Sequence, residues 1–227
     1  MFSLAAFYCS QSIKLQMDSS VVLVYFLLSV VGLGSFAFHS TLILYAQYLD
    51  ALPMLFLATN SLQLTLHSSS RTQKVVIFLL LNALCLISCL VYIKLSSHVF
   101  HNILFGSVCL LSYFLATKIL RELDKMKKKT KNMVELFTKR GKILCIVAIL
   151  FWIADLYFCN ILKEIRTYIV FPLDSVFQFH LWWHVLVSIG AIYMINGIVL
   201  CIKLLHGIKM QGTVQYGFLP ILCTVNK

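Results

Sequence analysis

Residues 178–184 read Gln178-Phe179-His180-Leu181-Trp182-Trp183-His184 and stand at the start of the last long apolar segment. His180 and His184 are four positions apart, so on a helix they lie on one face with Cβ atoms about 5–6 Å apart. Two imidazoles at this spacing can bind one metal ion if a third ligand comes from elsewhere in the chain. The alternative interpretation is that both histidines lie at a membrane interface, where neighbouring tryptophans anchor a helix.

The whole chain is strongly apolar. Of its 227 residues, 60% are hydrophobic and only 12% are charged, and the mean hydropathy is +0.90. This composition excludes an ordinary soluble domain. The net charge of +11 does not indicate nucleic-acid binding, because the basic residues lie in loops between apolar runs. This distribution is typical of a membrane protein, whose cytosolic loops are rich in lysine and arginine. The eight cysteines include no CxxC pair, so they indicate neither a disulfide framework nor a thiolate zinc site.

Six apolar runs are long enough to cross a bilayer as helices, since each span needs about 20 residues. They cover residues 20–45, 48–66, 75–93, 99–120, 143–162 and 177–205. Residues 1–9 are apolar but too short to span, and we expect a helix remnant there. We expect residues 121–142 to form a basic cytosolic loop and residues 206–227 a cytosolic tail. The predicted fold is therefore all-α, with residues 1–227 forming a single polytopic transmembrane helix bundle.

The distribution of lysine and arginine predicts the orientation of this bundle. If the loop at 121–142 is cytosolic, alternation of six spans places three basic residues on the opposite side, namely Lys94, Lys163 and Arg166. Both termini are then cytosolic. His39 and Asp50 flank the first lumenal turn in this arrangement, and His180 and His184 begin the last helix from the same side. We therefore expect these four polar groups to lie at one depth.

Three histidines with one open position form the ligand set of a catalytic zinc site. We therefore predict that His39, His180 and His184 bind zinc, although three imidazoles also suit other transition ions. Bound zinc lowers the pKa of a water to about 7 and polarises a carbonyl. Asp50 is the candidate group to accept the proton of that water or to orient a histidine. The alternative interpretation of Asp50 is a helix cap at the interface.

Ser35 precedes His39 by four residues and therefore lies on the same helix face. Its hydroxyl is a candidate donor to an oxyanion. The alternative interpretation is a contact between helices, because Ser35 stands beside Gly32 and Gly34 and small residues permit close packing.

Asp155, in the fifth span, is a more deeply placed acid than Asp50. Trp152, Asp155 and Cys159 share one helix face, so we expect all three to point into the bundle. Asp155 is predicted to accept a hydrogen bond from a histidine or to tie helices together. Four other histidines lie near predicted ends of spans and receive no special role, namely His67, His98, His101 and His206.

Four stretches together resemble the alkaline ceramidases, membrane amidases of the endoplasmic reticulum and the Golgi. Residues 32–41 resemble the family's G-x-G-S-x-x-F-H-x-T stretch, and residues 47–54 resemble its Q-x-L-D-E-L-P-M segment. Residues 152–159 resemble W-x-x-D-x-x-x-C, and residues 178–184 resemble Q-F-H-A-W-W-H. The similarity extends from about Val21 to Leu219 and points to the phytoceramidase branch.

The resemblance implies a seven-helix fold with zinc on the three histidines and with Ser35 and Asp50 at the reacting centre. It also implies hydrolysis of the amide of ceramide or phytoceramide to a sphingoid base and a fatty acid. The family's acidic N-terminal segment, with its E-N-Y stretch and calcium site, has no counterpart here, and most of the first helix is missing. We therefore expect no calcium site. Ala51 and Asn160 stand where the family usually has acidic residues, but neither is a predicted zinc ligand.

Two alternative functions remain at this point. One is a lipid-sensing membrane receptor of the adiponectin-receptor type, a family that also combines a serine, three histidines and an aspartate in seven helices. The face of Trp152, Asp155 and Cys159, together with the pair Trp182 and Trp183, favours the ceramidases. The other is a shortened, catalytically inactive form that regulates a full-length enzyme. In each case the partners are membrane lipids.

Overall fold

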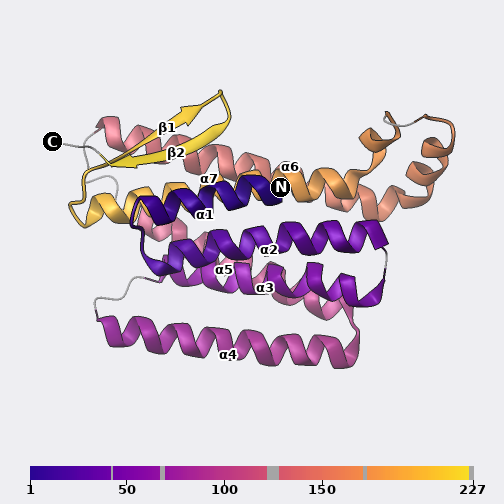
Figure 1. Ribbon diagram of the computed structural model, residues 1–227, viewed down its shortest axis with the longest axis horizontal. Helices are drawn as coiled ribbons and strands as arrows, with labels where there is room; N and C mark the ends of the chain where they lie inside the picture. Colours follow the sequence, from indigo (N-terminus) through magenta and orange to yellow (C-terminus); the bar gives the residue numbers. More distant parts are fainter. Residues whose placement is uncertain (42, 67–69, 122–127, 171–172, 225–227) are drawn as a thin grey trace. The chain divides into compact units, whose positions relative to one another are not determined.

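The computed structural model describes residues 1–41, 43–66, 70–121, 128–170 and 173–224 (Figure 1). It confirms the all-α class: α-helices make up most of the described chain, accompanied by one 3-10 helix and one two-stranded hairpin. The chain divides into two compact units. The first contains Met1–Lys127 with Ile198–Gln211 and Cys223–Lys227, and the second contains Lys128–Gly197 with Gly212–Leu222.

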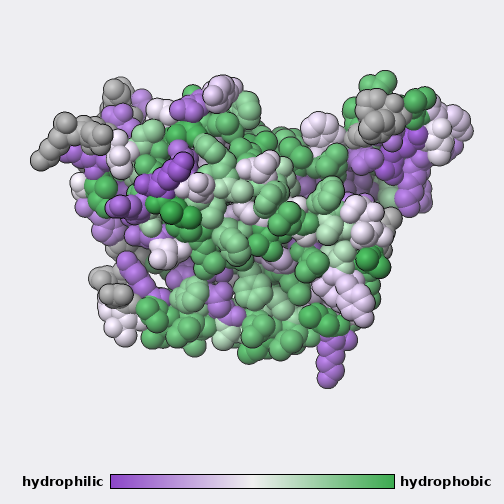
Figure 2. Space-filling model, viewed as in Figure 1, coloured by the Kyte–Doolittle hydropathy of each residue, from purple (hydrophilic) through white to green (hydrophobic). Residues whose placement is uncertain are grey.

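Five helices of the described chain are long and apolar enough to cross a membrane. They are α2 (Ser19–Thr41), α4 (Arg71–Leu95), α5 (His98–Arg121), α6 (Lys128–Thr167) and α7 (Phe179–Leu205). Hydrophobic side chains cover the face of α4 that Figure 2 shows, as expected for a helix in contact with lipid. The predicted second span forms α3 (Leu44–Thr65), which does not reach the same hydropathy because it contains polar residues such as Gln47, Asp50 and Asn60.

In the first unit, helix α3 packs against α2, α4 and α5. This central position explains its polar residues, because their side chains face other helices instead of lipid. Asn60 and Asn82 show the effect: the Nδ2 atom of Asn60 donates to Oδ1 of Asn82 over 3.1 Å, and the reverse pair is separated by 3.4 Å. These amides join α3 to α4 within the apolar part of the unit.

Helix α1 (Phe2–Lys14) packs against α2 and extends beyond the predicted remnant at 1–9. Its buried residues Ala5, Tyr8 and Ser12 recur at helical spacing and so form one face. The ring of Tyr8 stacks on that of Tyr25 of α2 at a centroid distance of 5.5 Å. A Cβ atom on Gly32 would lie only 2.9 Å from the backbone nitrogen of Phe2, so the glycine permits this close approach.

The second unit is built on α6 and the adjoining part of α7. Gly141 and Gly190 permit the close packing of these helices, because a Cβ on Gly141 would meet Met194 and one on Gly190 would meet Cys145. Strands β1 (Met210–Gln215) and β2 (Leu219–Thr224) pair as a hairpin, of which residues 212–222 belong to this unit. Asn196 of α7 donates from Nδ2 to the carbonyl oxygen of Pro220 over 2.8 Å and so fixes this part of the hairpin.

The structure corrects two predicted segments. The basic segment 121–142 is not a loop from Lys128 onward, because α6 begins there; residues 122–127 lie outside the described chain. Lysine and glutamate are good helix formers, and Lys131 and Glu135 pair four positions apart at 3.8 Å. Part of the predicted tail at 206–227 is likewise the β1–β2 hairpin, whose turn contains Tyr216 and Gly217 at positive φ; residues 225–227 lie outside the described chain.

Candidate active site

Asp50 is the acidic centre of the first unit. It lies inside α3, six residues after the helix begins, and only 8% of the residue is exposed. The interpretation of Asp50 as a helix cap is therefore wrong. Its Oδ2 atom lies 3.9 Å from Nε2 of His39, in the last turn of α2, and the hydroxyl of Ser35 is close enough to interact with the carboxylate. The structure thus brings together three of the predicted site residues.

Gly34 explains how α2 and α3 come close enough for these contacts. A Cβ atom at this position would collide with the carbonyl of Leu49, the residue before Asp50. The missing side chain of Gly34 therefore lets the backbone of α3 approach α2 at the level of Ser35, which is itself buried. Close helix packing and the polar contact of Ser35 are consequences of the same arrangement, so the two interpretations of this serine do not exclude each other.

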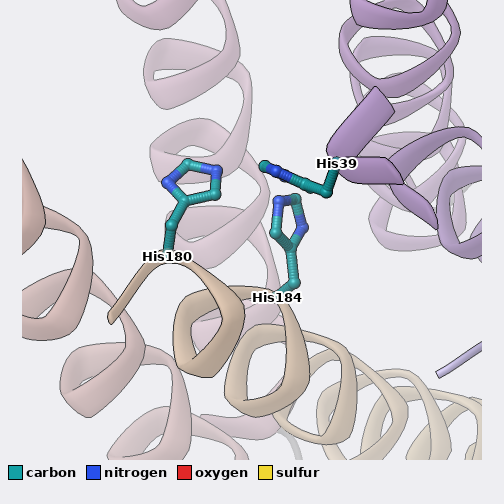
Figure 3. A group of neighbouring side chains, drawn as sticks. All are labelled: His39, His180 and His184. Carbon is teal, nitrogen blue, oxygen red and sulfur yellow. The ribbon is translucent and has the colours of Figure 1, made fainter. Parts of the chain in front are cut away.

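His180 and His184 form the histidine pair of the second unit. Figure 3 shows both imidazoles on the same side of α7, and their ring centroids are 4.9 Å apart. His184 is buried, at 4% exposure, whereas His180 is partly exposed. The Nδ1 atom of His180 lies 3.6 Å from Oδ2 of Asp155 on α6. This distance is longer than a hydrogen bond but short enough for the carboxylate to act on the imidazole electrostatically.

Aromatic residues pack α6 against the histidine-bearing turn of α7. The rings of Trp152 and Trp183 have a centroid distance of 6.1 Å, and Phe151 lies 5.2 Å from Phe179. The indole of Trp182 donates to the carbonyl of Val176, which precedes α7, over 3.1 Å. These contacts hold the first turn of α7 in place and thereby fix the positions of His180 and His184 relative to α6. Cys159, the third residue of the predicted face, is half-buried one turn beyond Asp155.

The donor set suits a transition metal. His39, His180 and His184 each offer one ring nitrogen as a ligand, and Figure 3 shows His39 at the end of α2 and the other two on α7. Imidazole is a usual ligand of zinc, copper, iron and nickel. Asp50 lies close to His39, and Asp155 lies close to His180. Metal-binding imidazoles commonly have such a carboxylate near the ring nitrogen that does not bind the metal.

A polar network of the first unit was not predicted from the sequence. The amide of Gln47 lies 3.4 Å from Nε2 of His98, and Nδ1 of His98 lies 3.4 Å from the hydroxyl of Tyr92. The Tyr92 hydroxyl is within electrostatic reach of Asp50. Helical spacing does not link these residues, since they come from α3, α5 and α4. The sequence signals are the position of Gln47 one turn before Asp50 and its place at the start of the family-like stretch 47–54.

Comparison with known proteins places the chain in a family. A model of the ceramidase family matches residues 1–221. Alkaline ceramidase 3 of Mus musculus is 27% identical over 188 residues, which cover 80% of this chain and 66% of the relative. Alkaline ceramidase YPC1 of Saccharomyces cerevisiae is 26% identical over 212 residues, which cover 86% of this chain and 66% of the relative.

The chain thus spans just under two thirds of the length of these two relatives. The family match nevertheless extends over all but the last six residues and includes every residue of the candidate site. It confirms the family predicted from the four motifs: the chain belongs to the ceramidase family.

Proposed function

We propose that this membrane protein hydrolyses the amide bond of ceramide or phytoceramide and releases a sphingoid base and a fatty acid. The observation that carries the proposal is the contact of Ser35 and His39 with the buried Asp50, in a chain of the ceramidase family. Burying a carboxylate within an apolar helix bundle is costly, and carboxylates that persist there commonly serve a function, so the position of Asp50 favours chemistry at this point.

We further propose that His39, His180 and His184 hold one zinc ion. The proposal is supported by the three imidazole donors and by the carboxylates beside His39 and His180. Zinc held by imidazoles supplies Lewis acidity, which makes a water nucleophilic near neutral pH and polarises a carbonyl. Both effects favour amide hydrolysis, because an amide is a poor electrophile.

Asp50 is proposed as the general base and then the general acid. Its carboxylate accepts a proton from the water whose oxygen bonds to the amide carbon. When the carbon–nitrogen bond breaks, the same proton passes from Asp50 to the leaving nitrogen, which departs as the free amine of the sphingoid base. The carbonyl carbon keeps the water oxygen and becomes the carboxyl group of the fatty acid. The 3.9 Å separation from His39 places Asp50 next to a proposed ligand, as this role requires.

Ser35 has two proposed roles. Its hydroxyl interacts with the Asp50 carboxylate and can orient that group. When substrate is bound, the same hydroxyl is a candidate donor to the oxygen that becomes negative as water adds to the carbonyl. Both roles need the buried position that the contact of Gly34 with Leu49 gives to this residue.

The membrane itself supplies the substrate in this proposal. The exposed large hydrophobic side chains of α4 and α5 face lipid, so ceramide can reach the protein without leaving the bilayer. We propose the endoplasmic reticulum or the Golgi as the location, with both termini in the cytosol, because the excess of lysine and arginine lies in the segments assigned to that side.

The test is the zinc content and the ceramide hydrolysis of one detergent-purified sample of the full chain. We expect about one zinc per chain and release of sphingoid base, and we expect chelation to remove both. Zinc without turnover would contradict the hydrolase proposal and favour the inactive, regulatory form. Turnover that survives complete removal of zinc would contradict the metal-dependent mechanism.

A further inference from the structure

His101 of α5 is a buried polar residue that the proposed mechanism does not use. Only 5% of it is exposed. Its ring lies 4.9 Å from that of Tyr92 and is nearly parallel to that of Phe105, at 6.3 Å and 7°. Within the described chain, neither ring nitrogen makes a hydrogen bond. Buried polar side chains almost always have such a partner, so this imidazole is one donor and one acceptor available to a ligand.

Tyr92 of α4 offers a second group of the same kind. An amide nitrogen only donates, so Nε2 of His98 accepts from Gln47 over 3.4 Å. A neutral His98 then carries its proton on Nδ1 and donates it to the Tyr92 oxygen over 3.4 Å. The proton of the Tyr92 hydroxyl must therefore point away from His98. Only 2% of Tyr92 is exposed, so this donor is directed into the protein.

Tyr92 connects these two groups to α3, the helix that carries the proposed catalytic carboxylate. The ring of Tyr92 stands edge-on to that of Tyr48 at 5.6 Å, so this part of α4 packs against the first turns of α3. The Tyr92 hydroxyl is within electrostatic reach of Asp50. Next to His101, Phe105 packs against the apolar core cluster of Leu55, Cys85 and Cys89. A few polar groups on an apolar background are typical of a site that orients a lipid headgroup.

We propose that Tyr92 and His101 form a hydroxyl-binding subsite beside Asp50, which holds a hydroxyl group of the sphingoid part of the substrate. This proposal rests on the proposed function. A hydroxyl both donates and accepts, and so matches a tyrosine O–H together with a neutral imidazole. A fatty-acid carboxylate fits less well, because its charge would be repelled by Asp50. Tyr92 and His101 thus bind and orient the part of the substrate that leaves as the amine.

The kinetic test compares substrates that differ by one hydroxyl of the sphingoid base. Tyr92→Phe keeps the ring contacts with Tyr48 and His101 and removes only the hydroxyl. For the substrate that carries the recognised hydroxyl, KM should rise roughly tenfold, as expected for one lost hydrogen bond, while kcat changes little. For the substrate that lacks it, KM should not change. Tyr157→Phe is the matched control, because Tyr157 is 80% exposed on α6.

His101→Leu tests the second residue and should give the same substrate-dependent rise of KM. If either variant raised KM equally for the substrates with and without the hydroxyl, the residue would have a merely structural role, and the subsite would be overturned. A binding measurement keeps this test separate from the proposed hydrolysis: the free sphingoid base should raise the melting temperature of the wild type more than that of Tyr92→Phe. Equal shifts in both proteins would overturn the subsite, even if the wild type hydrolyses ceramide.

Discussion

The Oδ2 atom of Asp50 and the Nε2 atom of His39 are 3.9 Å apart, although the two residues belong to different helices. Their proximity follows from Gly34, whose missing side chain lets α2 approach the backbone of α3 beside Asp50. The same approach buries Ser35 against the carboxylate. A proton acceptor, a candidate metal ligand and a hydroxyl donor therefore share one place in the first unit.

Asp50→Asn should abolish most of the hydrolysis without removing the metal. The amide of asparagine has nearly the shape of the carboxylate but cannot accept the proton of a water, so kcat should fall about 10²- to 10⁴-fold. Zinc content, measured on the same sample, should stay at the wild-type value. Asp18→Asn is the control, because the Asp18 side chain is largely exposed and its ion pair with Lys203 contributes little. An unchanged kcat in Asp50→Asn would remove this residue from the mechanism.

His184→Ala should strip the metal and abolish hydrolysis together. The residue is buried on the same side of α7 as His180, and a site with only two imidazoles should not retain zinc through purification. The control is His206→Ala, which removes an exposed histidine that follows the last turn of the same helix. Metal content measured by elemental analysis decides the result: a normal zinc level in His184→Ala would contradict the proposed ligand set.

The sequence predicted the membrane-spanning helices well because long apolar runs determine them. It placed one expected span at 20–45, however, whereas α2 ends at Thr41 and α3 begins at Leu44. The apolar residues continue through this junction, so hydropathy alone does not reveal it. The helical part of the basic segment differs from the prediction for another reason. Clustered lysines indicate a cytosolic loop by their charge, but lysine is also a good helix former, and α6 begins at Lys128.

The candidate site was predicted by helical spacing and motif resemblance, which select Ser35, His39, Asp50, His180 and His184. Spacing reports only neighbours on one helix. It could not show that the Tyr92 hydroxyl meets His98, or that His101 packs on Tyr92, because these contacts depend on how α4 and α5 pack. From the sequence, both histidines lie only near predicted ends of spans, which assigns them no role.

Asp155→Asn should weaken metal binding rather than abolish it. The carboxylate lies 3.6 Å from Nδ1 of His180, where its charge makes the other ring nitrogen a better ligand. Loss of such a partner typically lowers metal affinity about 10- to 100-fold. Titration with a competing chelator should therefore remove zinc from Asp155→Asn at a lower chelator concentration than from the wild type. If the same chelator concentration removed half of the zinc from both proteins, Asp155 would have a purely structural role.

Gly34→Ala should destabilise the first unit and lower activity, because the new methyl group would collide with the carbonyl of Leu49. Overpacking of this kind costs about 1–3 kcal/mol, since the backbones must move apart. Gly106→Ala is a matched control on α5: a Cβ at that position meets nothing within 4 Å, and alanine favours a helix over glycine by about 1 kcal/mol. The melting temperature in detergent should therefore fall for Gly34→Ala and stay level or rise for Gly106→Ala.

If α2 and α3 instead separate without unfolding, Gly34→Ala should keep its melting temperature but lose kcat, because Ser35 and His39 would move away from Asp50. A variant with both wild-type stability and wild-type kcat would show that the close approach at Gly34 is not needed to build the site.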